Sequence, residues 1–167
     1  MLNVTNKSQL LDIRATIFAG YPIHAKDIPH HSIFQWFRAF LRTAITLCTF
    51  DNEGSRVAKH KLGKTQGMHE SFESVPSELI ILKARRDSAI LRAFIRFIFG
   101  KRTCFAESLA ICAGLRCLGF GSYVIVGFAR VEMFAPTQLH AWVECEGKMV
   151  SDPDEIKYGY VELQKYC

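Results

Sequence analysis

The stretch TCFAESLAICAGLRCLGFG, Thr103–Gly121, decides the predicted fold. Most of its residues are apolar, and glycines stand at its C-terminal end. This pattern is typical of a buried helix that begins near Thr103–Cys104 and ends at Gly119 or Gly121. The run that follows, YVIVGFARV at 123–131, is almost entirely apolar and rich in β-branched residues. It therefore predicts a buried strand.

After a short loop, the residues 139–152, LHAWVECEGKMVSD, predict a hairpin that turns at Glu146–Gly147. A helix followed by three strands gives an α+β unit with antiparallel pairing. We therefore predict an α+β fold in which a helix that starts at a cysteine packs on a small antiparallel sheet.

Upstream of this unit the sequence predicts a helix from Ser32 to about Cys48. The stretch 51–76 is polar and punctuated by glycines, so we predict a long connection there, with a short strand near 56–62. The helix prediction rests on apolar residues at three- and four-residue spacing: Ile33, Trp36, Phe37, Phe40, Leu41, Ala44 and Ile45.

A second upstream helix opens at Ser77 and ends at Gly100. We divide the chain into an N-terminal helical and loop region, 1–76, and a catalytic core, 77–167. The predicted solvent face of the Ser77 helix carries five basic residues, namely Lys83, Arg85, Arg86, Arg92 and Arg96.

Composition places the chain among globular proteins of one domain. It has 167 residues, 49% hydrophobic and 22% charged, which excludes disorder and fibrous repeats. The longest uncharged apolar run, Gly119–Ala129, is far shorter than the ~20 residues of a membrane span. The N-terminus lacks the pattern of a secretory signal, so we expect a cytoplasmic protein without a transmembrane segment.

In a reducing cytoplasm the cysteines are expected to be free thiols. No Cys-x-x-Cys pair is present, so a structural zinc site has little support, and we expect no cofactor. The chain has six cysteines: Cys48, Cys104, Cys112, Cys117, Cys145 and Cys167.

Charge is unevenly distributed along the chain. Up to Thr103 there are 16 Lys and Arg against 8 Asp and Glu, a net of +8, and from Cys104 onward 5 against 8, a net of −3, which together give the total of +5. A basic half is compatible with an acidic peptide, a nucleic acid or a membrane surface. A solvated basic face is the simpler interpretation, and the sequence lacks a nucleic-acid recognition motif, so we expect no nucleic-acid partner.

Cys104 differs from the other cysteines in its position. At the start of a helix, and after Lys101 and Arg102, the helix dipole, the free backbone N–H groups and two cations all favour a thiolate. Cys112 and Cys117 fall inside the same helix, where packing is the ordinary role of a cysteine.

The hairpin carries a histidine and an aspartate, His140 and Asp152, on either side of its turn. A two-residue loop would pair Ala141 with Asp152 and leave His140 on the opposite face. A three-residue loop would pair Trp142 with Asp152, so that Asp152 and His140 share a face and lie diagonally within hydrogen-bonding reach. The sequence leaves both registers open.

Cys, His and Asp together form the set of a nucleophile, a general base and a group that orients the base. His140 would take the thiol proton of Cys104, and Asp152 would hold the imidazole. The backbone N–H of Cys104 would help to form an oxyanion hole. The competing interpretation makes His140 a half-buried strand residue and Asp152 a cap beside the turn.

The order of these motifs resembles the lasso-peptide leader peptidases, the B proteins of lasso-peptide gene clusters, which belong to the papain/transglutaminase-like superfamily. The resemblance covers about 50 residues from Cys104 to Asp152, with a looser likeness in the Phe-rich helix at 33–50. It rests on CFAESLA at 104–110, LGFGSYVIVG at 118–127, HAWVE at 140–144, Gly147 and VSD at 150–152.

The resemblance implies a papain/transglutaminase-like core and a cysteine peptidase that removes the leader from a lasso precursor peptide. Cys104 would be the nucleophile, His140 the base and Asp152 the orienting group. Trp142 and Glu144 match the motif and would shape the substrate site.

The resemblance also implies partners. The precursor peptide is the substrate, and a separate ATP-dependent cyclase then closes the macrolactam. Fused members of the family carry an N-terminal leader-recognition domain, for which residues 1–31 are too short. We therefore expect the split form, which uses a separate recognition protein.

Two other classes of function stay open. The same three residues would serve a transglutaminase-like acyltransferase or an amidase, because they do not determine which group accepts the acyl chain. A non-catalytic binding module of the same fold would not need all three residues.

Overall fold

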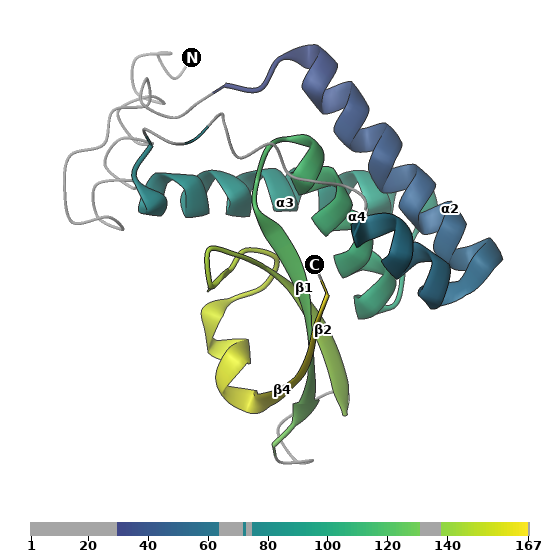
Figure 1. Cartoon of the computed structure of the whole chain (residues 1–167), viewed down its shortest axis with the longest axis vertical. Coiled ribbons are helices and arrows are strands. Elements are labelled where there is room, and N and C mark those ends of the chain that lie inside the picture. The colour runs from purple at the N-terminus through teal and green to yellow at the C-terminus, as the bar shows by residue number, and fades with distance from the viewer. Residues whose placement is uncertain (1–29, 64–71, 73–74, 131–137, 167) are drawn as a thin grey trace, which may run out of the picture.

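A computed structural model describes residues 30–63, 72, 75–130 and 138–166, and it has an α+β fold (Figure 1). The predictions for residues 1–29 and for most of the loop at 132–138 lie outside the described residues. In chain order the elements are α2 (Ile33–Gly63), α3 (Ser77–Phe99), α4 (Cys104–Cys117), β1 (Ser122–Ala129), β2 (Leu139–Cys145), β3 (Lys148–Met149), the 3-10 helix η3 (Asp154–Gly159) and β4 (Tyr160–Tyr166).

The four strands form one antiparallel sheet in the order β3-β2-β1-β4. The predicted strand after the Cys104 helix and the predicted hairpin are confirmed as β1 and β2–β3. The sequence analysis missed β4, an edge strand in which Tyr160 is the only fully buried residue. With so little of it buried, β4 carries almost no hydrophobic pattern.

Helix α4 is the central element of the described core. Its residues from Ala106 to Arg116 are all buried, between the sheet on one side and α2 and α3 on the other (Figure 1). The helix begins at Cys104, as predicted, because Thr103 caps it: the Thr103 side chain accepts a hydrogen bond from the Ala106 N–H. It ends at Cys117, just before Gly119.

Helix α2 runs much further than the sequence analysis predicts. The long connection and the strand near 56–62 are wrong for residues 51–63, which are helical beyond a kink at Gly54. Ala58 and Leu62 are buried in the same core as α4, and their four-residue spacing is that of a helix face. Only these two residues mark the buried side of this segment, and so short an apolar pattern did not stand out in the sequence.

Helix α3 spans Ser77–Phe99 and ends before Gly100, as predicted. Its basic face is only partly solvated. Lys83 is 5% exposed and donates to Asp87, which also contacts His31 at 2.9 Å. A buried lysine is tolerated only when it is paired, and Asp87 supplies the opposite charge.

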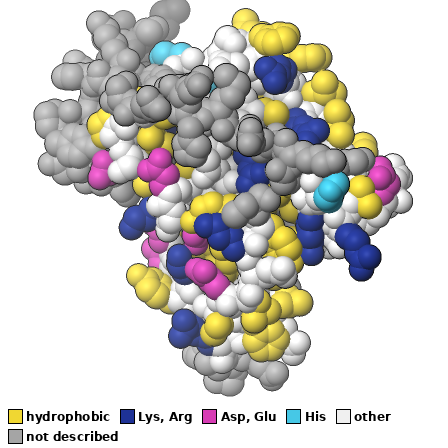
Figure 2. All heavy atoms as spheres, in the orientation of Figure 1, with side chains coloured by type: hydrophobic (Ala, Val, Ile, Leu, Met, Phe, Trp, Pro, Cys, Tyr) yellow, Lys and Arg dark blue, Asp and Glu magenta, His cyan; other side chains and the backbone are white. Residues whose placement is uncertain are grey.

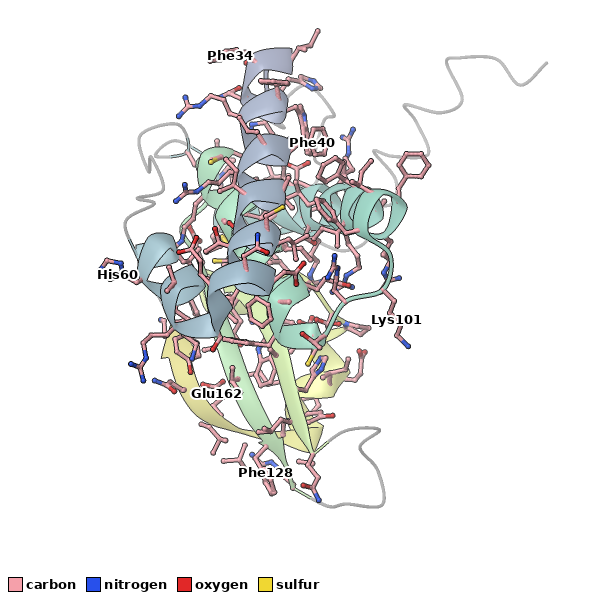
Figure 3. All side chains as sticks on the ribbon, turned by 90° about the vertical axis from the view of Figure 1, so that its right-hand side faces the viewer. Phe34, Phe40, His60, Lys101, Phe128 and Glu162 are labelled. Atoms are coloured by element: carbon pink, nitrogen blue, oxygen red, sulfur yellow. The ribbon has the colours of Figure 1, made fainter. Side chains whose placement is uncertain are left out.

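The first half of α2 is apolar on nearly all sides. Trp36 and Phe40 pack against the core, as the spacing predicts. Four other large apolar residues lie on the opposite side and form what we call the α2 apolar stripe, and Figure 3 labels the first of them, Phe34, at the upper end of the helix. The stripe consists of Phe34, Phe37, Leu41 and Ile45, which are 43–67% exposed.

Gly114 of α4 lies close to side chains of both α2 and α3, which gives a test of the packing. A Cβ atom at this position would lie 2.5 Å from Thr43 Oγ1 and 2.8 Å from Leu91 Cδ1. We therefore predict that Gly114→Ala lowers the free energy of unfolding by about 1–3 kcal/mol, although alanine is the better helix former.

Urea denaturation measures this change. Gly159→Ala is the matched control, because a Cβ atom there meets nothing within 4 Å. Equal stability of the two variants would contradict the described packing of α2, α3 and α4.

Candidate active site

The first residue of α4, Cys104, lies at the surface end of an otherwise buried helix. Its thiol is partly exposed, and Sγ lies 4.0 Å from the carbonyl oxygen of Leu139. Leu139 directly precedes His140 on β2, so the thiol sits beside the start of the strand that carries the candidate base. The N-terminus of α4 also offers backbone N–H groups and the positive end of the helix dipole near this thiol.

The hairpin between β2 and β3 has a two-residue turn. Cys145 pairs with Lys148, and both turn residues have positive φ, 50° at Glu146 and 77° at Gly147. This is the geometry of a tight primed turn, for which glycine is the favoured second residue. The three-residue loop, which the sequence analysis required for bringing His140 and Asp152 together, is therefore not the one present.

His140 and Asp152 nevertheless meet, with His140 Nε2 3.9 Å from Asp152 Oδ1. The reason is that the strand ladder ends early. The Val143 N–H donates to Ser151 Oγ at 2.8 Å, and the Val150 carbonyl accepts from Ser88 instead. The last backbone bond between the two strands runs from the Val150 N–H to the Val143 carbonyl, so Asp152 does not take the position opposite Ala141 that an extended ladder would give it.

Two neighbours hold the carboxylate of Asp152. Ser151 Oγ donates to its Oδ2 at 2.6 Å, and Arg92 Nη2 on α3 approaches the same oxygen at 3.5 Å. The other oxygen, Oδ1, faces His140. The Asp152 side chain is 14% exposed, so most of its interactions are with the protein.

The imidazole of His140 rests on aromatic rings. Its centroid lies 6.1 Å from that of Trp142, in a stacked arrangement, and 5.4 Å from that of Tyr160. Burial lowers the pKa of His140 below its ordinary value, Asp152 acts in the opposite direction, and Arg92 lowers it further. A lowered pKa keeps the ring neutral at pH 7, the form that can accept a proton.

The structure brings two of the three predicted catalytic residues, His140 and Asp152, close together without a hydrogen bond between them. No hydrogen bond joins Cys104 to His140 in the part of the chain that the structure describes, and His140 Nε2 is buried without a hydrogen-bond partner. Catalytic hydrogen bonds are often long in the absence of substrate, and the separation of His140 Nε2 from Asp152 Oδ1 is 3.9 Å.

The two residues predicted to shape the substrate site, Trp142 and Glu144, lie on the same face of β2 as His140. Trp142 is fully buried and Glu144 is 3% exposed. Glu144 accepts hydrogen bonds from Trp142 Nε1, the Tyr123 hydroxyl and Lys157 Nζ, at 3.0–3.1 Å. These contacts are all with other residues of the protein, and the bond from Glu144 holds the Trp142 ring on which His140 stacks. Direct contact of either residue with substrate stays a prediction.

The sequence analysis did not assign Arg92, Ser151 or Tyr160 to the site. Ser151 stands directly before Asp152, where a hydroxyl able to bond a neighbouring carboxylate is a usable signal. Arg92 looked like an ordinary member of a basic helix face. Tyr160 belongs to the strand that the sequence did not predict.

Among the other cysteines, Cys145 is fully buried, and burial raises its pKa to about 12. It is therefore a protonated, inaccessible thiol at neutral pH. Cys48 is exposed on α2.

Across the residues that the structure describes, no three His, Cys, Asp or Glu side chains are grouped so as to hold a metal ion.

Comparison with known families assigns the fold. Residues 56–164 match the transglutaminase-like superfamily, and the chain belongs to that superfamily. Its members are often cysteine hydrolases or acyltransferases. Neither the curated proteins nor the solved structures contain a significant match.

None of the helices described has the length and apolar character needed to cross a membrane.

The opposing influences on His140 give a pH-dependent prediction. Because the charge of Asp152 raises the pKa of His140, we expect Asp152→Asn to lower that pKa further. NMR titration of the His140 Cε1–H resonance, assigned by its loss in His140→Gln, measures the change.

Asp154→Asn serves as the control, since Asp154 pairs with Arg85 at 2.6 Å and is 55% exposed. It should leave the titration of His140 unchanged. An unchanged or raised pKa in Asp152→Asn would mean that the two side chains do not interact in solution.

Proposed function

We propose that this protein is a cysteine peptidase in which Cys104 is the nucleophile, His140 the general base and Asp152 the group that orients His140. The observation that carries the proposal is the approach of His140 Nε2 to Asp152 Oδ1 at 3.9 Å, beside a partly exposed thiol at the start of a buried helix. Membership of the transglutaminase-like superfamily supports acyl-transfer chemistry at such a thiol.

In the proposed reaction His140 takes the proton of Cys104 Sγ, and the sulfur attacks the scissile carbonyl carbon. The carbonyl oxygen becomes an oxyanion, which the Cys104 N–H at the start of α4 would stabilise. The C–N bond then breaks, the leaving amine takes the proton from His140, and a thioester remains on Cys104. Water, deprotonated by His140, attacks the thioester carbonyl carbon. The C–S bond breaks, the acyl part leaves as a carboxylic acid, and Cys104 Sγ takes the proton back from His140. No step requires a cofactor.

The proposed substrate is the precursor of a lasso peptide. The support is the resemblance between residues 104–152 and the leader peptidases of that pathway. The leader would form the acyl part of the thioester, so the core peptide would leave first, with a free amine. A separate ATP-dependent cyclase needs that amine to close the macrolactam.

We further propose that a separate leader-recognition protein presents the precursor in the cytoplasm. The α2 apolar stripe supports a protein partner, because contiguous exposed apolar residues on a soluble protein commonly mark an interaction site. In this proposal residues 1–76 contribute the partner contacts and residues 77–167 the chemistry.

A transglutaminase-like acyltransferase is the second candidate, favoured by the superfamily itself. It would form the same thioester and pass the acyl group to an amine instead of water. Adding a primary amine such as cadaverine to the assay separates the two: a peptidase gives the free acid, and an acyltransferase gives the amide.

The proposed nucleophile can be tested directly by mass spectrometry. A candidate lasso precursor is incubated with its recognition protein and either the wild type or Cys104→Ala. We expect cleavage at one bond with the wild type and a loss of at least about 1,000-fold in rate with Cys104→Ala, because the nucleophile is gone.

Cys117→Ala is the matched control, since Cys117 is also a partly exposed thiol but lies at the opposite end of α4. It should cleave the precursor as the wild type does. Cleavage that survives Cys104→Ala would overturn the assignment of the nucleophile.

A further inference from the structure

Arg92 of α3 lies between two carboxylates that belong to different parts of the fold. Its Nε is 2.6 Å from Glu107 Oε1, and its Nη2 is 3.5 Å from Asp152 Oδ2. The side chains are 24%, 9% and 14% exposed for Arg92, Glu107 and Asp152. Solvent screens such partly buried pairs only weakly, so the attraction between their charges is stronger than in a surface ion pair.

The elements that Arg92 connects are those of the candidate site. Glu107 stands in the first turn of α4, three residues after Cys104 and one helical turn below it. Asp152 follows β3 and approaches the imidazole of His140. One guanidinium therefore links the helix that carries the thiol to the carboxylate that faces the base.

The contacts at Asp152 indicate what this link does. Ser151 and Arg92 both approach Oδ2, which leaves Oδ1 toward His140. A carboxylate held on one oxygen by a hydroxyl and a guanidinium has little freedom to rotate about its last bond. Ser151 at 2.6 Å and Arg92 at 3.5 Å thus act together on Oδ2 and leave Oδ1 for His140.

Arg92 also acts on His140 through its charge. The groups that influence the imidazole come from several elements: Asp152 raises its pKa, Arg92 lowers it, and the rings of Tyr160 and Trp142 pack on it. Glu107 forms an ion pair with Arg92 and holds the guanidinium beside α4, although Arg92 Nε lies outside hydrogen-bonding geometry. Losing the hold on Asp152 would remove an influence that raises the pKa of His140, so that pKa should fall even where the charge at position 92 is kept.

We propose that Arg92, anchored by Glu107, is a positioning residue that fixes Asp152 toward His140 and so aligns the base with the start of α4. The effect on turnover rests on the proposed peptidase function. The effect on His140 does not, because it is measured without substrate.

The surroundings of Arg92 permit the necessary substitutions. Arg92 and Asp152 border an open pocket of about 420 Å³ between α3 and the loop after β3. Figure 2 shows positively and negatively charged side chains intermixed on the surface between α3 and η3. A shorter side chain at position 92 leaves space that water can enter, so it creates no dry cavity in the core.

The test compares Arg92→Gln, Arg92→Lys and Arg96→Gln. Arg96 is the matched control: it lies one turn further along α3 and approaches the same Glu107 at 3.6 Å, but its side chain is 61% exposed and no contact of the described residues joins it to Asp152. Each variant is checked for folding by circular dichroism. The pKa of His140 is then measured by NMR titration, and kcat/KM with the precursor by mass spectrometry.

We expect both Arg92 variants to reduce kcat/KM by about 10- to 100-fold through misplacement of Asp152. Arg92→Lys keeps the charge but cannot span both carboxylates with a planar fork, so Asp152 is no longer held toward His140 and the pKa of His140 should fall. Arg92→Gln also removes the positive charge that lowers this pKa, so its His140 should titrate above that of Arg92→Lys. Arg96→Gln should change neither quantity.

A folded Arg92→Lys whose His140 titrates as in the wild type would overturn the proposal, as would an equal effect of Arg96→Gln. If the wild type cleaves no precursor, the peptidase function fails while the NMR comparison still tests the role of Arg92. The folded Arg92→Lys variant decides the question if Arg92→Gln does not fold.

Discussion

The complete burial of α4 beyond its first turn is the constraint on which the rest of the structure depends. Three small residues, Ala110, Ala113 and Gly114, allow α2, α3 and the sheet to approach the helix from several sides. The first backbone N–H groups of a helix have no partner within the helix, so burying them in an apolar core would be unfavourable. The N-terminus of α4 accordingly lies at the surface. Thr103 caps that end, and Cys104 occupies the position where the core meets solvent.

A second constraint sets the distance between the candidate base and its partner. The hairpin turn fixes the register of β2 and β3, but the ladder is cut short when Ser151 replaces a backbone carbonyl as the acceptor for the Val143 N–H. The same hydroxyl then donates to Asp152. One serine thus both ends the strand pairing and orients the carboxylate that faces His140, which explains why turn length alone did not decide the geometry.

The sequence predicted the elements that bury a continuous apolar face. These are α3, α4, β1 and the hairpin, in which hydrophobic spacing and turn residues agree. It failed for residues 51–63 of α2, because only Ala58 and Leu62 mark the buried side there, and for β4, an edge strand with little burial. For the candidate site it supplied Cys104, His140 and Asp152, whereas the link through Arg92 depends on the packing of α3 on α4, and no local pattern encodes it.

The most direct test of the account is to identify the covalent intermediate. Wild-type protein is mixed with a candidate precursor and its recognition protein, quenched in acid within the first turnover, digested, and analysed by mass spectrometry. The account predicts the leader attached as a thioester to the peptide that contains Cys104, sensitive to hydroxylamine. Cleavage of the precursor with the adduct on another residue, or with none on Cys104 under conditions that trap a control thioester, would contradict it.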